Sequence, residues 1–164
     1  MLSDGLGVMW LEIRVLTLED AIVHKDALVK LLYEILVSNF QELLCTYAEK
    51  YYHDMRGFLQ DGSAIVFGAF SDKKLVGIIW GYEISHFGQK RIHCTMIGVK
   101  NGYRGQDIGS QLLRELETVA LSRGLNHIEV MVTSENEDAL RYYNRNGFRV
   151  ERVKMLKTIE QVLA

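Results

Sequence analysis

The 164-residue sequence predicts one α/β (α+β) domain, in which a mixed, mostly antiparallel central sheet carries helices on both faces. Three observations predict it. Apolar side chains recur at helical spacing early in the chain, β-branched and aromatic runs with short turns fill the middle, and helix and strand patterns then alternate. A chain of this length suits one hydrophobic core, so residues 1–164 are read as a single domain. Residues 1–10 are expected to be a flexible or peripheral N-terminal extension.

The predicted elements follow one another in the order βααβββαβαβ. Residues 11–17 alternate apolar and polar side chains, as a half-buried strand does, and the run from Glu19 to Leu36 has the period of an amphipathic helix. The further elements are a helix over about 40–59, an antiparallel meander over 63–70, 73–85 and 90–99, a helix over 109–123, a strand over 127–132, a helix over 136–146 and a closing strand over 148–156. The sequence contains no proline, so its turns are expected at Gly, Asn, Asp and Ser.

Composition and charge exclude several classes of protein. Hydrophobic residues make up 48% of the chain and charged residues 24%, as in ordinary globular proteins. A formal net charge of −2 argues against a general nucleic-acid-binding protein. The apolar stretches are too short for a membrane span and the N-terminus has no secretory pattern, so we expect a cytoplasmic protein. Cys45 and Cys94 are isolated, and no His, Cys, Asp or Glu spacing indicates a metal site.

One loop has the pattern of an anion-binding site. In the segment YRGQDIGSQLL (103–113), Gly105 and Gly109 bracket three residues between a strand-like run and an amphipathic helix. Unpaired N–H groups and the positive end of the helix dipole favour anions at such a position. Arg104 can add a charge-assisted contact. The spacing fits neither the P-loop of nucleotide triphosphate-binding proteins nor the dinucleotide fingerprint.

Asp107 places a carboxylate inside this loop, and two interpretations are open. Its side chain can cap the helix by accepting hydrogen bonds from the N–H groups of residues 109 or 110. Alternatively, it points to solvent and only its backbone N–H faces a ligand. Either arrangement repels a pyrophosphate, weakly where the charge is exposed and screened by salt.

Two segments of the chain match known motifs in the expected order. IGVKNGYRGQDIGSQLL (97–113) is similar to a strand end followed by a Q/R-x-x-G-x-G/A pyrophosphate loop and a helix. NEDALRYYNRNGF (136–148) fills every marked position of the element N-x-x-A-x-x-x-Y-x-x-x-G-F. Together they resemble the GNAT superfamily of acyl-CoA-dependent N-acyltransferases over residues 75–156. The departures are Asp107, where the family normally has glycine, and Asn101, where it commonly has proline.

The resemblance implies that acetyl-CoA is the cosubstrate, and the spacing of His, Cys, Asp and Glu gives no reason to expect a metal. In this family the backbone of the strand end pairs with the pantetheine arm, a role that falls here on Ile97, Gly98 and Val99. The N–H near Ile97 would polarise the thioester carbonyl. The residues implied for the pyrophosphate are Arg104, Gly105, Gln106, Asp107, Ile108, Gly109 and Ser110.

The second motif implies two further site residues. Asn136 would contact the cofactor near its thiol end. Tyr143 would also bind the cofactor and act as the general acid, because a phenol keeps its proton at neutral pH and can pass it to the departing thiolate. Tyr142 lies beside it, and the complete motif favours Tyr143.

Three side chains compete with a water chain for the role of general base. His93 lies four residues before Ile97, on the same face of the predicted strand, and histidine exchanges protons near neutral pH. Glu129 and Glu83 are the carboxylate alternatives. His93 is the preferred candidate. The alternative is that His93 is an ordinary strand histidine with no catalytic role.

The sequence therefore favours an N-acetyltransferase that transfers an acetyl group from acetyl-CoA directly to a primary amine on a small molecule or a protein. One alternative is a degenerate, non-catalytic acyl-CoA-binding or regulatory domain, suggested by Asp107. Another is a helix-mediated interaction protein whose glycine loop is only a turn. Tyr47, Tyr51 and Tyr52 are expected to line the acceptor pocket or to form a homodimer surface.

The acceptor and the length of the acyl chain are not specified by the sequence. The acidic residues Glu83, Glu129 and Glu135 give a weak indication of a cationic acceptor.

Overall fold

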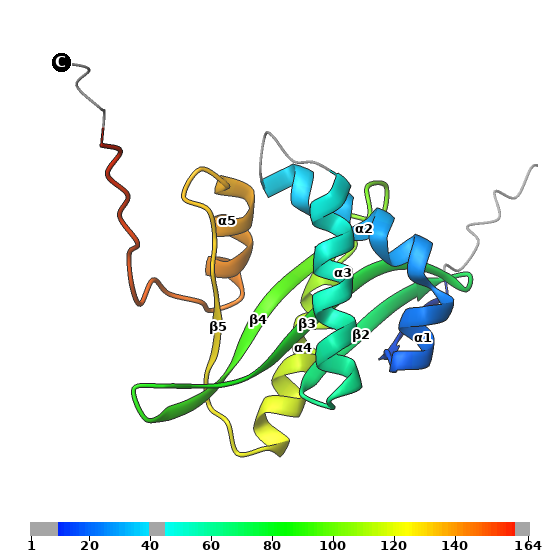
Figure 1. The fold of residues 1–164 in the computed structure, drawn as a ribbon, viewed down its shortest axis with the longest axis horizontal. Coiled ribbons are helices and arrows are strands. Elements are labelled where there is room, and N and C mark those ends of the chain that lie inside the picture. The colour runs from blue at the N-terminus through cyan, green and yellow to red at the C-terminus, as the bar shows by residue number, and fades with distance from the viewer. Residues whose placement is uncertain (1–9, 40–44, 160–164) are drawn as a thin grey trace, which may run out of the picture. The chain divides into compact units, whose positions relative to one another are not determined.

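The computed structural model describes residues 10–39 and 45–159, which form two compact units that divide between Met131 and Val132 (Figure 1). The predicted N-terminal extension lies outside the described residues except for Trp10. The elements of the first unit are β1 (Leu11–Val15), α1 (Leu18–Val23), α2 (Lys25–Asn39), α3 (Cys45–Gln60), β2 (Ala64–Ser71), β3 (Lys74–His86), β4 (Gln89–Val99), α4 (Ile108–Ser122) and β5 (Ile128–Val130). Among the described residues, no helix is long and apolar enough to cross a membrane.

The five strands form one sheet in the order β1-β2-β3-β4-β5. Neighbouring strands are antiparallel except for β4 and β5, which are parallel. Helices α1, α2 and α3 cover one face, where their apolar side chains form a core with Ile78, Trp80 and Met96. Helix α4 lies on the other face, where a Cβ on Gly77 would come within 3.2 Å of Leu112 (Figure 1). The predicted fold class, a mostly antiparallel mixed sheet with helices on both faces, is confirmed.

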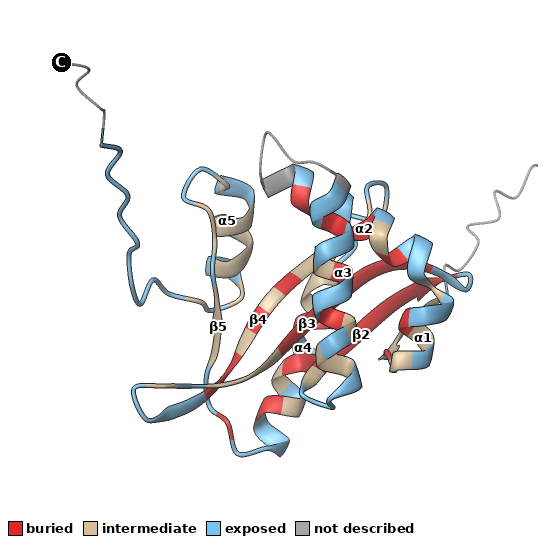
Figure 2. Ribbon diagram, viewed as in Figure 1, coloured by how far each residue is buried: buried red, intermediate tan, exposed pale blue. Residues whose placement is uncertain are grey.

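The core follows from the apolar pattern of the central strands. Residues 65–71 of β2 and 75–81 of β3 are buried without interruption, because both faces of these strands are covered by helices (Figure 2). On α4 the buried residues include Leu112, Leu113 and Leu116, as the helical period predicts. The loops and strand ends that follow therefore extend from a sheet whose central strands are buried on both faces.

One helix was predicted from Glu19 to Leu36, but the structure has two, α1 and α2, which are separated at His24. The His24 N–H donates to the Asp20 carbonyl oxygen at 2.9 Å, and its own carbonyl accepts from Leu28 at 2.9 Å. One helix thus ends and the next begins at the same residue. The helical spacing of apolar residues continues across His24, so the sequence pattern could not reveal the interruption.

The second unit, described over residues 132–159, contains α5 (Glu137–Arg145), close to the predicted helix. The closing strand predicted over 148–156 is wrong, because these residues form neither a helix nor a strand. A strand exists only where a neighbouring strand supplies hydrogen bonds to its backbone, and alternating apolar residues do not provide that partner. Val150, Val153 and Leu156 are each at least 75% exposed.

Candidate functional site

The loop between β4 and α4 has the backbone conformation of an anion site. Gly105 and Asp107 both take left-handed angles, with φ of 76° and 60°. The first i to i−4 hydrogen bond of α4 runs from the Gln111 N–H to the Asp107 carbonyl at 3.0 Å. The N–H groups of Ile108, Gly109 and Ser110 precede that bond, so the helix itself supplies them with no acceptor. An anion placed there would meet the positive end of the helix dipole.

Asp107 occupies the N-cap position of α4 without capping it through its side chain. The capping interpretation is therefore wrong. The carboxylate instead pairs with the Arg114 guanidinium at 2.9 Å, and both side chains are more than half exposed. Hydrogen bonds from Arg114 and Ser110 lower the pKa of the Asp107 carboxyl. A left-handed backbone favours glycine, the residue that the resemblance implies at this position, and Asp is among the residues that tolerate that conformation.

Arg104 fastens the loop to the strand before it. Its Nε donates to the Val99 carbonyl at 2.9 Å, which occupies one of the backbone groups predicted to pair with the pantetheine arm. A contact between Arg104 and a pyrophosphate would therefore use the terminal Nη groups. Gln106 also bonds back to the loop, donating to the Gly102 carbonyl at 3.4 Å.

The resemblance to the GNAT superfamily implies an acetyl-CoA site at this loop. For such a site, we expect Asp107→Gly to strengthen acetyl-CoA binding by only about two- to threefold at low salt, because the carboxylate is exposed and already paired with Arg114. The gain should disappear at high salt. Calorimetric titration at two ionic strengths measures it. Asp107→Asn is the matched control, since it removes the charge and still tolerates the left-handed backbone. A gain of several orders of magnitude would mean instead that Asp107 blocks the site.

One edge of β4 is open where the loop begins. The ladder between β4 and β5 covers Ile92, His93 and Cys94 of β4 and ends there, whereas β4 continues to Val99. Within the described residues, β5 therefore offers no partner to the backbone of residues 95–99 on that side. Ile97, Gly98 and Val99, the residues predicted for the pantetheine arm, all lie in this stretch.

A β-bulge separates His93 from Ile97. The register between β3 and β4 shifts at Trp80 and Gly81, so that His93 lies opposite Tyr82 and Ile97 opposite Ile79. Partners three residues apart on β3 point to opposite faces of the sheet. The prediction that His93 and Ile97 share a face is therefore wrong, because a bulge changes the parity of the strand.

His93 lies on the α3 face among aromatic and charged side chains. Its ring packs 5.5 Å from the ring of Tyr82, and Tyr82 stacks on Phe58 of α3 with centroids 4.7 Å apart. Its Nδ1 lies 2.9 Å from Oε1 of Glu129, on the neighbouring strand β5. Arg91 also pairs with Glu129, at 3.2 Å. The structure thus brings two of the three predicted base candidates into direct contact.

Glu83, the third candidate, is separated from this group. It lies opposite Ile92 on β3, so it points to the face away from His93. Its carboxylate pairs with Lys90 at 2.9 Å. Glu83 and Glu129 are therefore both balanced by cations of this chain, which removes most of the acidic character proposed to attract a cationic acceptor.

Three contributors were not predicted from the sequence: Arg91, Tyr82 and Phe58. Arg91 is only 5% exposed, and a buried arginine implies a partner anion. Its place two residues before His93, on the same face of one strand, was the available signal. Tyr82 and Phe58 looked like ordinary core residues, and only the β3–β4 register and the stacking reveal that they flank His93.

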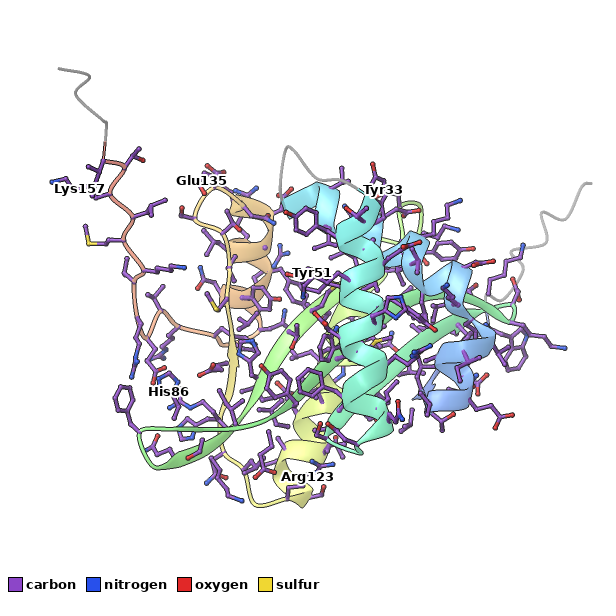
Figure 3. All side chains as sticks on the ribbon, viewed as in Figure 1. Tyr33, Tyr51, His86, Arg123, Glu135 and Lys157 are labelled. Carbon is purple, nitrogen blue, oxygen red and sulfur yellow. The ribbon has the colours of Figure 1, made fainter. Side chains whose placement is uncertain are left out.

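The three tyrosines of α3 that were predicted to share one surface differ in their exposure to solvent. Tyr52 is buried by its own chain, and its hydroxyl donates to the Ala21 carbonyl at 3.1 Å. It is a core residue of the first unit, so it neither lines a pocket nor forms an exposed dimer surface. Tyr47 is exposed, and Tyr51, which is labelled in Figure 3, is partly buried against the core.

The second unit contains Asn136 and Tyr143. The Asn136 side chain accepts from the Ala139 N–H at 3.0 Å and so caps α5, a structural role that the motif did not reveal. The Tyr143 ring packs edge to face against Tyr142 and against Phe148, with both centroids 5.2 Å away. These contacts fix the Tyr143 ring within its unit.

The fold and the loop together define a class: a mixed-sheet protein in which a helix N-terminus without a side-chain cap follows the end of strand β4. The chain belongs to the GNAT acetyltransferase family, whose family model matches residues 29–148.

Relatives agree with this assignment. A spermidine N(1)-acetyltransferase from Thermoplasma acidophilum is 31% identical over 84 residues, 51% of this chain and 50% of that protein. The chain spans about half the length of the curated relatives it matches. A PaiA N-acetyltransferase from the same organism, solved with coenzyme A, superposes with a TM-score of 0.72 at 23% identity, covering 89% of this chain and 94% of that one. An aminoglycoside acetyltransferase from an uncultured soil metagenomic sample gives 0.70 at 18% identity, covering 92% and 97%. At these identities the two structures show the fold alone.

Proposed function

We propose that the protein transfers an acetyl group from acetyl-CoA directly to a primary amine of a small molecule or a protein. The observation that carries this proposal is the loop at residues 104–110, where two left-handed residues lead into an uncapped helix N-terminus next to the open edge of β4. N–H donors and a guanidinium are the groups that a pyrophosphate requires. The residues present therefore fit the acyl-CoA that the family uses.

The same residues divide the work of binding. The N–H groups at the start of α4 and the Arg104 guanidinium would hold the pyrophosphate, together with the backbone from Gly105 to Ser110. The backbone of Ile97, Gly98 and Val99 would hold the pantetheine arm as a further strand would. The family motif assigns Asn136 and Tyr143 to the thiol end.

Acetyl-CoA would supply an acetyl group activated as a thioester. His93 would take a proton from the acceptor amine, and the backbone N–H near Ile97 would polarise the thioester carbonyl. A carbon–nitrogen bond forms while the carbon–sulfur bond breaks. Tyr143 would then return a proton to the sulfur of the departing thiolate.

Direct transfer is favoured over transfer through Cys94. Cys94 follows His93 on β4, but it is buried, and burial raises the pKa of its thiol to about 12. The thiolate is the reactive form of cysteine, and it is essentially absent at neutral pH with such a pKa. Cys94 is therefore unsuited to carry an acetyl group.

The non-catalytic alternative rested on Asp107, and the geometry of Asp107 weakens it. The carboxylate is turned toward Arg114 and does not occupy the N–H groups at the start of α4. We further propose that residues 1–164 act as one N-acetyltransferase domain, since the family match runs from 29 to 148, across the division at Met131.

The proposal is tested by following release of the CoA thiol from acetyl-CoA with a panel of amines, including spermidine, an aminoglycoside and a lysine peptide. Spermidine and an aminoglycoside are included because two proteins similar to this chain are named as acetyltransferases of these compounds. We expect thiol release that depends on one amine class and matches the acetylated amine found by mass spectrometry. Acetyl-CoA binding without release for any amine would favour the non-catalytic alternative.

A further inference from the structure

The carboxylate of Glu129 lies at the centre of three basic side chains from two other strands. His93 Nδ1 lies 2.9 Å from Oε1, Arg91 Nη1 lies 3.2 Å from Oε2, and His86 Nδ1 lies 3.5 Å from Oε2. His86 comes from β3, near the turn of the β3–β4 hairpin (Figure 3). The parallel register of β4 and β5 places Glu129 directly beside His93, so the pairing of the two strands brings these side chains together.

The two carboxylate oxygens have separate partners. Oε1 faces His93, while Oε2 faces the guanidinium of Arg91, whose other Nη is 3.4 Å from the Gln89 side-chain oxygen. Burial alone would raise the pKa of Glu129, but hydrogen bonds from His93 and Arg91 outweigh it and the pKa is lowered. Glu129 is therefore ionised at neutral pH with both oxygens engaged. This makes it a poor proton acceptor for a substrate amine.

An ionised carboxylate can only accept hydrogen bonds. The ring nitrogen that faces it at 2.9 Å, Nδ1 of His93, must therefore carry a hydrogen. In a neutral imidazole the other nitrogen, Nε2, is then the one with the free electron pair. Tyr82, stacked on Phe58, packs against the ring and limits its rotation.

We propose that Glu129 is a positioning residue that holds His93 in the Nδ1–H form, so that Nε2 is the atom that accepts the proton of the acceptor amine. Arg91 is the fixed cation that holds Glu129 in place. The catalytic part of this inference rests on the proposed acetyl transfer, whereas the effect of Glu129 on the His93 ring does not.

The test combines NMR of the ¹⁵N-labelled histidine rings with kinetics, using the full chain. His93→Gln identifies the His93 signals. In the wild type we expect the Nδ1–H form. Glu129→Ala should raise the Nε2–H form, and Glu129→Gln should do the same, because its single oxygen cannot serve both Arg91 and His93. With its oxygen on Arg91, the Gln amide would turn N–H groups toward Nδ1.

In the acetyl-transfer assay both variants should lower kcat by about 10- to 100-fold, with the KM for acetyl-CoA changed less than about twofold. Glu129→Gln keeps the volume of the side chain, so it remains informative if the alanine variant unfolds. Glu83→Gln is the matched control: an acid on the adjacent strand, paired with Lys90 on the opposite face, whose loss should change neither readout.

An Nε2–H form in the wild type, or a His93 ring that is indifferent to both substitutions, would overturn the inference. A change in the protonated nitrogen of the His93 ring that leaves kcat unchanged would also overturn it. A wild type that transfers no acetyl group would remove the proposed function instead, and the NMR measurement would still decide whether Glu129 fixes the His93 ring.

Discussion

Tyr143→Phe is expected to lower kcat for acetyl transfer by about 100-fold or more, because it removes only the hydroxyl proposed to protonate the departing thiolate. The phenylalanine ring keeps the edge-to-face contacts with Tyr142 and Phe148, so α5 should fold as before. The KM for acetyl-CoA should change little. Steady-state kinetics with a saturating amine measure both constants.

Tyr142→Phe is the matched control for this experiment. It removes the same group from the neighbouring position of α5, and kcat should stay within about twofold of the wild type. A larger loss for Tyr142→Phe than for Tyr143→Phe would reverse the roles that the family motif assigns to the two tyrosines.

His93→Gln is expected to lower kcat by about 100-fold, because glutamine can still hydrogen-bond to Glu129 but cannot take a proton from the amine. Binding of acetyl-CoA, measured by calorimetry, should be unchanged within about twofold. His53→Gln, a histidine exposed on α3, should leave both quantities as they are. Wild-type kcat in His93→Gln would move the role of base to a water chain.

Most of the fold was predictable because its elements depend on local patterns. The strands β2, β3 and β4 and the helix α4 were predicted from period and turn residues alone. The errors arose where a partner decides the structure. Residues 148–156 have the alternation of a strand without a strand beside them, and the break at His24 leaves the apolar period intact.

The sequence predicted which residues belong to the candidate site better than it predicted how they are arranged. The motif identified the loop, and His93 was proposed from its position four residues before Ile97. The bulge that turns His93 and Ile97 to opposite faces depends on pairing with β3. The ion pair of Asp107 with Arg114 joins residues seven apart, and the Asp107 side chain makes no capping hydrogen bond. The contact of His93 with Glu129 joins residues 36 apart, so only the sheet register brings them together.

Acetyl-CoA binding at the β4–α4 loop underlies the proposed function, and it can be tested without knowing the acceptor. Gly105 and Gly124 have φ of 76° and 70°, and a Cβ would meet nothing within 4 Å at either. Alanine should therefore strain the backbone equally at both, although they lie near opposite ends of α4.

Calorimetric titration of acetyl-CoA into the wild type, Gly105→Ala and Gly124→Ala is the decisive measurement. We expect micromolar binding by the wild type and Gly124→Ala. Gly105→Ala should bind at least about tenfold more weakly, because its methyl group would occupy space needed by the pyrophosphate. Equal affinities in all three proteins, or no binding by the wild type, would contradict acetyl-CoA binding at this loop.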